Sequence, residues 1–593
     1  MTAVATRAVL TIAAVTCSGA ALAADLPALG RMPDDAMNTC PLSQSDFDAT
    51  WGSLVAPPPL AGAPLLPPLF DPLTGMAYIF PPDGPNFSDA GYDPTNCAFF
   101  AWSEQMFLWA TSPIQFGEQL FDKEVPANIV PPDSSTNYVF SSEFFYRLDS
   151  FTALQPQTND GSVDGNMAVR GGKADEPASS TVGQAGRTNG VLYTQADTSV
   201  SKASSLVYYE IYASRPYGYV RDALLNQAPS PYDFTEFPTD VASVCDAIGY
   251  GIRNGFVELS GGVNAKFFAV FCRQGTGGAD ASNAELTDAL GSGGAPNGAQ
   301  LEVAVDYLAM AVELKAAWVE ASSLVNPDTY FQQEGSVPNF VPGPDGTTLV
   351  QDGHKTVTLA LVGLHIVGTV NGHPEMVWAT FEHIDNAPNV TYFYTDTSGN
   401  PATHDDMASV ASTSWLLSDG TSTNANAEYA IVETSADQVT SIVASPSSPG
   451  GAVTTPTNAN RLHPWGSPAT EASAAVNAEM ISSNIGVINA LSNFYQGVPG
   501  DQTSRDTLSG NDLRLNYLMT GSSWGDATFP TGSDVSQIAG TPAMANTTME
   551  TFTQSITDAN GGLNGCFSCH GIKEGEDKFD VSHIFGGITS VAK

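Results

Sequence analysis

Positively charged side chains are scarce in this chain. Its 593 residues include 21 Lys and Arg against 62 Asp and Glu, which gives a formal net charge of −41. Binding to nucleic acid or to an anionic membrane surface requires clustered Lys and Arg, so this composition argues against both as partners. Charged residues of both signs make up only 14% of the chain, and uncharged polar side chains must therefore cover much of the surface.

Long apolar runs are lacking as well. No segment reaches the roughly 18 uninterrupted apolar residues of a membrane helix, so we expect no membrane span. The N-terminus is typical of an export signal, with Arg7, an apolar stretch over residues 8–16 and a small-residue cleavage site that ends at Ala23. The sequence predicts a signal peptide over residues 1–23 and a mature protein that is periplasmic or secreted, by bacterial export.

Cysteine is rare, and one of the seven, Cys17, lies within the signal peptide. The other six are Cys40, Cys97, Cys245, Cys272, Cys566 and Cys569. Export permits disulfides, and the four cysteines that precede residue 566 allow three connectivities. Pairing each cysteine with its nearest neighbour in sequence predicts disulfides Cys40–Cys97 and Cys245–Cys272.

The last two cysteines belong to a CFSCH motif at residues 566–570. In a Cys-x-x-Cys-His motif the two thiols bond to the vinyl groups of haem and the histidine ligates the iron. A zinc site would need two more ligands nearby, and His583 alone follows the motif. A thioredoxin-like motif would need a βαβ context. The sequence therefore predicts one covalent haem c, held by Cys566 and Cys569, with His570 as an iron ligand.

The motif identifies one axial ligand of the iron, His570, and does not identify the second. No methionine follows Cys566, which excludes a ligand of that type downstream. His583 lies in an apolar context after His570, and the intervening loop is long enough to return on the far face of a porphyrin, so His583 is the first candidate for the second metal ligand. Met544, Met549, a histidine of the body and an open position are the alternatives.

The chain behind the motif is short, because only 23 residues follow His570. So short a segment cannot enclose a haem by itself. We therefore expect the large body of the protein to supply much of the wall of the haem pocket.

The overall pattern predicts an α+β fold, with a sheet-rich body, several helices and a C-terminal haem segment packed on it. A Pro- and Gly-rich arm over residues 24–95 is expected to follow the surface. The body is expected to span residues 96–540, as one or two subdomains, and the haem segment residues 541–593.

Hydrophobic periodicity places the main elements. The expected helices lie at residues 97–109, 300–322 and 468–495. The expected strands lie at residues 136–150, 190–215 and 511–519, and a buried hairpin at 356–384. Asn371-Gly372 is a strong signal for a two-residue turn in that hairpin, which pairs Val370 with His373 and His365 with Trp378.

Three histidines lie within this hairpin: His365, His373 and His383, close to Glu375 and Glu382. The expected register places His365 and Glu382 on one face and His383 on the other. These side chains do not converge, so core or turn roles are favoured over a catalytic or metal-binding role. No catalytic residue stands out in the sequence.

Four segments together resemble a group of large exported bacterial proteins, the cytochrome c family proteins. These are long, single-haem proteins with the motif near the C-terminus. The resemblance implies haem attachment at Cys566 and Cys569 and iron ligation by His570. The segments are Asn96 to Pro113, 311–320 (AVELKAAWVE), 373–388 (HPEMVWATFEHIDNAP) and 545–570 (ANTTMETFTQ…CFSCH).

The leading functional hypothesis is one-electron transfer by an exported monohaem c-type cytochrome, with a redox partner protein or a small-molecule electron donor or acceptor. The alternative is a haem-dependent oxidoreductase, peroxidase- or oxygenase-like, with a substrate pocket in the body. The two differ in whether the iron keeps an open coordination position.

Overall fold

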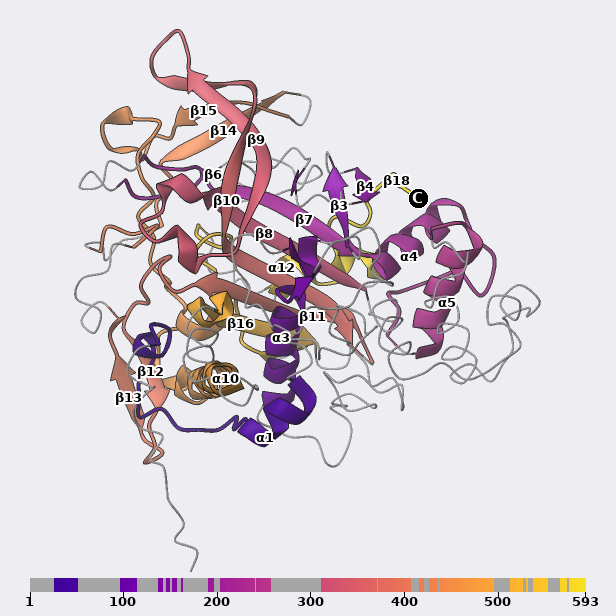
Figure 1. Cartoon of the computed structure of the whole chain (residues 1–593), viewed down its shortest axis with the longest axis horizontal. Helices are drawn as coiled ribbons and strands as arrows, with labels where there is room; N and C mark the ends of the chain where they lie inside the picture. Colours follow the sequence, from indigo (N-terminus) through magenta and orange to yellow (C-terminus); the bar gives the residue numbers. More distant parts are fainter. Residues whose placement is uncertain are drawn as a thin grey trace, which may run out of the picture.

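A large mixed β-sheet runs through the protein and carries helices on both faces (Figure 1). The structure is a computed structural model. It describes residues 26–51, 96–114, 137–141, 145–149, 152–156, 162–163, 190–196, 203–239, 241–256, 311–370, 372–406, 415–420, 426–435, 438–494, 512–525, 529–531, 537–544, 546–552, 566–572 and 575–593. Within them the sheet has 14 strands, and the predicted α+β fold is confirmed.

Nine strands form the main path of the sheet, and most neighbours in it are antiparallel. In order across the sheet they are β17 (Ile538–Gly540), β16 (Tyr517–Gly525), β11 (His373–His383), β10 (Thr348–Val370), β8 (Val312–Glu320), β7 (Tyr208–Ser214), β3 (Phe145–Asp149), β4 (Ala153–Pro156) and β18 (Ser590–Val591). The last pair, β4 and β18, is parallel, so the C-terminal residues complete one edge of this sheet.

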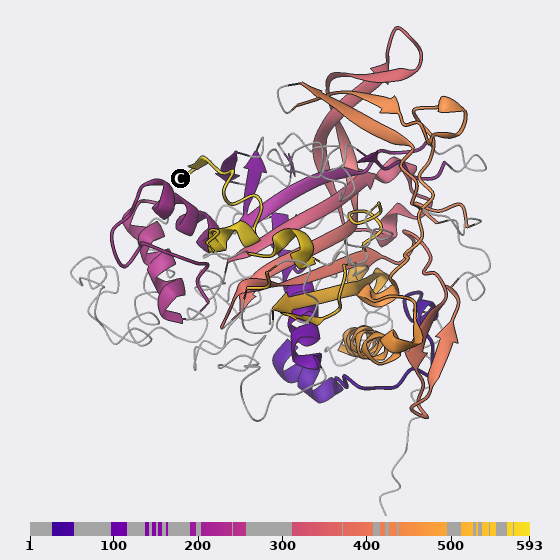
Figure 2. The same cartoon turned by 180° about the vertical axis from the view of Figure 1, so that it is seen from behind.

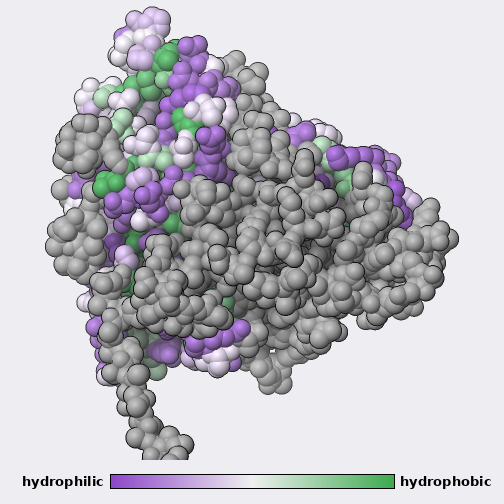
Figure 3. Space-filling model, in the orientation of Figure 1, coloured by the Kyte–Doolittle hydropathy of each residue, from purple (hydrophilic) through white to green (hydrophobic). Residues whose placement is uncertain are grey.

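The first half of β10 leaves the main path and forms an arm, which projects at the top of Figure 1. Here β10 pairs with β9 (Gln332–Pro342) and β15 (Gln438–Ala444), and β15 pairs with β14 (Ala430–Ser435). Two short strands, β5 (Ser162–Val163) and β6 (Gly190–Val191), join β9 and β14. Hydrophilic residues cover much of the described surface of this arm (Figure 3).

The predicted helix at residues 300–322 is wrong over most of its described part, where the chain forms the central strand β8 and then the 3-10 helix η6 (Ala321–Ser323). Residues 300–310 lie outside the described residues. Leu314, Ala316 and Trp318 enter the core on one face, whereas Ala317 and Val319 enter another cluster. The period is therefore two, and pairing with β7 and β10 on both sides overrides the helical spacing of the apolar residues.

The hairpin of β10 and β11 is confirmed, and so is the pairing of Val370 with His373. The predicted pairing of His365 with Trp378 is wrong. A bulge between Gly368 and Val370 shifts the register, so that His365 pairs with Thr380 and Trp378 with Val367. Because the shift is two residues, each side chain keeps its face.

Two helices cover one face of the sheet, α3 (Cys97–Ala110) and α10 (Ala474–Phe494), as Figure 1 shows. They confirm the helices predicted from residue 97 and within 468–495. The aromatic side chains of α3 pack on the strands: Phe107 stacks on Phe381 of β11 with ring centroids 4.4 Å apart, and Phe99 stacks on Trp524 of β16 at 4.1 Å.

The predicted strand at 511–519 begins only at Tyr517, because a 3-10 turn, η12 (Leu513–Asn516), precedes it.

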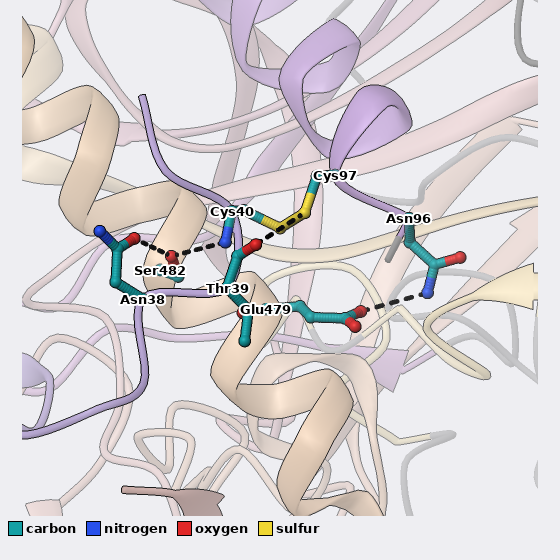
Figure 4. The surroundings of a disulfide bond; sticks show 7 residues. All are labelled: Asn38, Thr39, Cys40, Asn96, Cys97, Glu479 and Ser482. Atoms are coloured by element: carbon teal, nitrogen blue, oxygen red, sulfur yellow. Dashed lines mark hydrogen bonds between the residues drawn. A yellow bond between two sulfur atoms is a disulfide. The ribbon is translucent and has the colours of Figure 1, made fainter. Parts of the chain in front are cut away.

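The described part of the N-terminal arm is anchored in this face, contrary to the expectation that it follows the surface. Phe47 and Trp51 are buried in the main core beside α1 (Gln44–Asp46). The predicted disulfide Cys40–Cys97 is present, with Cα atoms 5.3 Å apart. Figure 4 shows it beside α10, where the backbone N–H of Cys40 donates to Ser482.

The second predicted disulfide is described at one end only. Cys245 lies on helix α5 (Val241–Arg253) and is disulfide-bonded. Its predicted partner Cys272 lies outside the described residues.

The opposite face of the sheet carries the C-terminal segment, beside α4 (Arg215–Leu225) and α5, as the view from behind shows (Figure 2). Two small sheets complete the described structure, β1 (Pro113–Ile114) with β2 (Asn137–Tyr138) and β12 (Tyr392–Thr395) with β13 (Pro401–His404). None of the helices described has the length and apolar character needed to cross a membrane.

Candidate functional site

The CFSCH motif forms a one-turn helix, α12 (Cys566–His570), at the start of the C-terminal segment. In a helix, positions i, i+3 and i+4 share one side, and these are the positions of the two cysteines and the histidine. Cys566 is half-buried. The side chain of Cys569 lies outside the described residues.

The segment behind the motif is built into the sheet. After the 3-10 turn η14 (Lys578–Val581), strand β18 pairs with β4, and Thr589 N–H donates to Thr152 O at 2.7 Å. On helix α4, the Arg221 guanidinium donates to the carbonyl oxygens of Gly586 (3.0 Å) and Ile588 (2.6 and 2.8 Å). The tail is therefore tied to the body at its far end.

An apolar cluster joins this tail to the sheet, and we call it the tail cluster. Its members come from the tail, from α4 and α5, and from the strand face beneath. The tail contributes Phe567, Ile572, Phe579, Val581, Ile584, Phe585 and Ile588, and the body contributes, among others, Tyr217, Phe237, Val367, Met376, Trp378 and Met544. This arrangement fits the expectation that the body walls the site predicted for the haem.

His570 is oriented by the chain that follows it. Its Nδ1 lies 2.7 Å from the backbone oxygen of Val581. A carbonyl oxygen can only accept, so Nδ1 carries the proton and donates it. Nε2 is then the nitrogen with the lone pair, which is the protonation state that a metal-ligating histidine needs.

Two aromatic rings lie against the imidazole of His570. The Trp378 indole of β11 has its centroid 4.2 Å away, and His583 stacks on His570 at 3.7 Å with an interplanar angle of 14°. The structure thus brings His583 to His570, as a shared site requires. Two imidazoles that ligate one iron from opposite sides point at each other end-on, so the His583 ring must leave this face-to-face stack to become the second ligand.

Ser582, the residue before His583, is held by two side-chain hydrogen bonds. Ser582 Oγ donates to Glu313 Oε2 of β8 at 2.5 Å, and because its only proton is used there, Ser582 accepts from the Tyr217 hydroxyl at 2.8 Å. Burial raises the pKa of Tyr217 well above its usual value, with the nearby charge of Glu313 adding to the effect. Tyr217 therefore stays protonated and keeps its donor role.

The exposed rim of the tail is acidic. Glu576, Asp577 and Asp580 lie within five residues. Burial raises the pKa of Asp580, and the neighbouring carboxylates of Asp577 and Glu576 raise it further. Lys578 pairs with Glu236 of the body, so this cation is already matched to a carboxylate.

The segment that leads into the motif docks on the same face of the sheet. Asn546 donates to Thr380 Oγ1 (2.9 Å) and Phe381 O (3.1 Å), and the carboxylate of Glu382 accepts from Thr547 N–H at 2.6 Å. Gly363 of β10 permits this approach, because a Cβ there would collide with Thr548. Residues 553–565, between this turn and α12, lie outside the described residues.

The alternative ligands fall in different places. Met544 is buried in the tail cluster with Phe567, whereas Met549 is buried in a separate cluster with Tyr209 and Val319. The structure therefore brings Met544, and not Met549, into the cluster that holds the motif.

The histidines of the hairpin have partners of their own. His365 Nε2 lies 2.7 Å from Glu550 Oε1, and His373 Nδ1 lies 2.7 Å from Glu375 Oε1. His383 stacks on Tyr330. Across the described residues, no three His, Cys, Asp or Glu side chains gather as a metal site.

The described residues fit a c-type haem. The motif is helical, the hydrogen bond of His570 Nδ1 to Val581 O orients its imidazole, and apolar side chains of tail and body surround the motif. No protein-family model matches the chain, and no curated protein or solved structure matches it significantly.

Sequence reasoning missed Trp378 and Val581, which contact His570 together with the predicted residue His583. Val581 acts through its backbone oxygen, which leaves no signal in the side-chain pattern. Trp378 lies on an apolar strand that reads as ordinary core. The run of Phe579, Val581, Ile584 and Phe585 in so short a tail was the available signal that it packs on the body.

Proposed function

We propose that this protein is an exported monohaem c-type cytochrome that transfers single electrons. The haem is attached through thioether bonds to Cys566 and Cys569, and His570 Nε2 ligates its iron. The observation that carries the proposal is the hydrogen bond from His570 Nδ1 to Val581 O at 2.7 Å. It selects the tautomer that ligates iron and fixes the direction of the ring.

The bound haem supplies an iron that accepts and releases one electron. The residues of this chain hold it and control its surroundings. The tail cluster excludes water from one side of the site. The sheet face forms the wall behind it, and this packing limits how far the surrounding residues rearrange when the iron gains or loses an electron. Cys566, His570 and His583 are half-buried, so the site lies near enough to the surface for exchange with a partner.

The partner follows from the charge of the site and of the whole chain. An acidic rim and a net charge of −41 favour a redox partner protein with a basic docking surface, or a cationic small donor or acceptor. The signal-like N-terminus supports a place in the periplasm or outside the cell. The segments that resemble cytochrome c family proteins agree with this assignment.

The first test is covalent haem. We expect the full chain, exported by a bacterium that performs c-type haem maturation, to carry a haem that survives denaturing electrophoresis. Cys566→Ser with Cys569→Ser should lose it. Ser568→Ala, which keeps the spacing of the motif, should retain it. A wild-type protein without covalent haem under these conditions would overturn the proposal.

The second test separates electron transfer from the alternative of a haem oxidoreductase with a substrate pocket in the body. An electron carrier is expected to have a six-coordinate, low-spin iron whose ferrous spectrum does not change with CO. A high-spin iron that binds CO readily would contradict the electron-transfer assignment in favour of the enzyme.

A further inference from the structure

The indole of Trp378 touches both ring-bearing residues of the CFSCH motif. Its centroid lies 4.2 Å from that of His570 and 6.1 Å from that of Phe567, which it meets in a T-shaped contact. Trp378 belongs to β11 in the middle of the sheet, and its side chain is 7% exposed. The motif helix therefore rests on a side chain carried by the main sheet.

The indole is itself held by a local hydrogen bond. Trp378 Nε1 donates to the backbone oxygen of Glu375 at 3.1 Å. The bond spans Met376, whose φ is +68°. A left-handed conformation is unfavourable for a residue other than glycine. The fold therefore holds a strained backbone between Trp378 and the carbonyl group that accepts its hydrogen bond.

Glu375, which supplies that carbonyl, is also fixed. It is fully buried, and its carboxylate lies 2.7 Å from His373 Nδ1 at the start of the strand. Burial raises the pKa of Glu375, while the bond to His373 opposes that rise. The backbone around Met376 is thus anchored on the face opposite the tail, where His373 packs edge-on to Phe99 of α3.

We propose that Trp378 is a positioning residue that sets the plane of the His570 imidazole. The inference rests on the proposed function, in which His570 ligates the haem iron. The hydrogen bond to Val581 directs one edge of the His570 imidazole, and the Trp378 indole blocks rotation of that imidazole about the axis through Nε2. His583 also packs on the imidazole, but it loses this contact if it moves away to ligate the iron. Trp378 is then the aromatic side chain that still packs on His570.

The plane of an axial imidazole has measurable consequences. It determines which iron d orbital meets the ligand π system, and therefore the spread of the g values of a low-spin ferric haem and the pattern of its paramagnetically shifted methyl resonances. Ordinary core packing affects neither quantity. These spectra can therefore distinguish a positioning residue from a merely structural one.

The experiment compares Trp378→Phe and Trp378→Leu with wild type, all as ferric cyanide adducts, so that the sixth ligand is the same in each. Trp378→Phe removes the hydrogen bond to Glu375 O and replaces the indole with a smaller aromatic ring. Trp378→Leu removes the aromatic ring altogether. We expect changed g values and reordered haem methyl resonances in Trp378→Leu, and a smaller change in Trp378→Phe. Covalent haem should remain in both.

Trp524→Phe is the matched control, because Trp524 is also buried, in the neighbouring strand β16, but packs on Phe99 at the opposite face. It should lower thermal stability without altering the haem spectra. Unchanged spectra in both Trp378 variants would overturn the inference while covalent haem still upheld the proposed function. Absence of haem from wild type would instead remove the function on which the inference rests.

Discussion

The imidazole rings of His570 and His583 stack face to face, with centroids 3.7 Å apart and planes 14° apart. The two residues therefore share one site. In this arrangement the rings face each other, so the predicted role of His583 as second ligand requires its side chain to turn out of the stack, and the role stays a prediction.

The first prediction concerns His583→Ala in the haem-loaded protein. If His583 is the second ligand, this variant should convert a low-spin ferric spectrum to high-spin and should gain CO binding in the ferrous state. Added imidazole should restore the low-spin spectrum. His404→Ala, at a partly buried histidine that pairs with Asp406 far from the motif, is the control. A low-spin spectrum that persists in His583→Ala would transfer the role to another residue, with Met544 the next to test.

A second prediction concerns acid stability and His383. Its Nε2 donates to Thr329 O at 3.2 Å, and its Nδ1 accepts from Asp385 N–H at 3.2 Å, so the neutral ring is fully engaged. Burial lowers the pKa of His383 to about 3. The unfolded chain takes up a proton below about pH 6.5 that the folded chain does not. The free energy of unfolding should therefore fall as the pH drops from about 6.5 towards 3.

His383→Gln should make this acid dependence shallower, by up to about 1.4 kcal/mol per pH unit. Denaturant unfolding at a series of pH values measures it. His354→Gln, at an exposed position of the arm, should leave the slope unchanged. An equal slope in His383→Gln and wild type would show that the imidazole is not kept neutral by the fold.

A third prediction concerns the opposite end of the pH range and Glu104 of α3. This side chain is 4% exposed, and its Oε1 has no hydrogen-bond partner within the described structure. Burial raises the pKa of Glu104 to about 8. The folded protein therefore holds a proton that the unfolded chain releases above about pH 4.5, and stability is lost as the pH rises through 8.

Glu104→Gln keeps the shape of the protonated acid and cannot ionise. We expect it to be more stable than wild type at pH 8 by a few kcal/mol and nearly equal to it at pH 4.5. Thermal unfolding at the two pH values tests this. The exposed residue Glu471 provides the control variant Glu471→Gln. A loss of stability in Glu104→Gln at pH 8 would contradict the expectation.

A fourth prediction concerns Gly363, where the turn of residues 546–552 meets the sheet. Gly363→Ala would place a Cβ against Thr548 and the amide of Asn546, and overpacking of this kind costs about 1–3 kcal/mol. The unfolding midpoint should fall accordingly. Gly30→Ala has open space around the new Cβ and should change stability little. Equal stability of the two variants would mean that the turn moves aside without cost.

The sequence predicted the features that depend on local spacing. The CFSCH motif, helix α3 and the Asn-Gly hairpin all follow from neighbours in the chain. The pairing of Cys40 with Cys97, 57 residues apart, follows from the small number of cysteines. Strand β8 was mistaken for a helix because its apolar residues, together with those before Val312, repeat at three and four positions. Pairing with β7 and β10 decides its conformation, and those partners are distant in sequence.

The contacts of the site show the same division. Cys566, Cys569 and His570, which are proposed to hold haem, can be read from the motif, but their surroundings cannot. Trp378 reaches His570 across 192 positions in the chain. The bulge that pairs Trp378 with Val367 has no signal in the residues around it. Contacts between residues so far apart in sequence depend on the order and register of all the strands in the sheet.

The CFSCH motif lies in a stretch of chain that is secured at both ends. Upstream, residues 546–552 are bonded to β11, and downstream β18 is paired with β4. Under the proposed function, an enzyme that attaches haem must reach both thiols of this motif. We therefore expect attachment to precede the pairing of β18 with β4, so that the formation of this edge follows cofactor loading. Protein allowed to fold before haem is supplied should then carry less covalent haem than protein matured during folding.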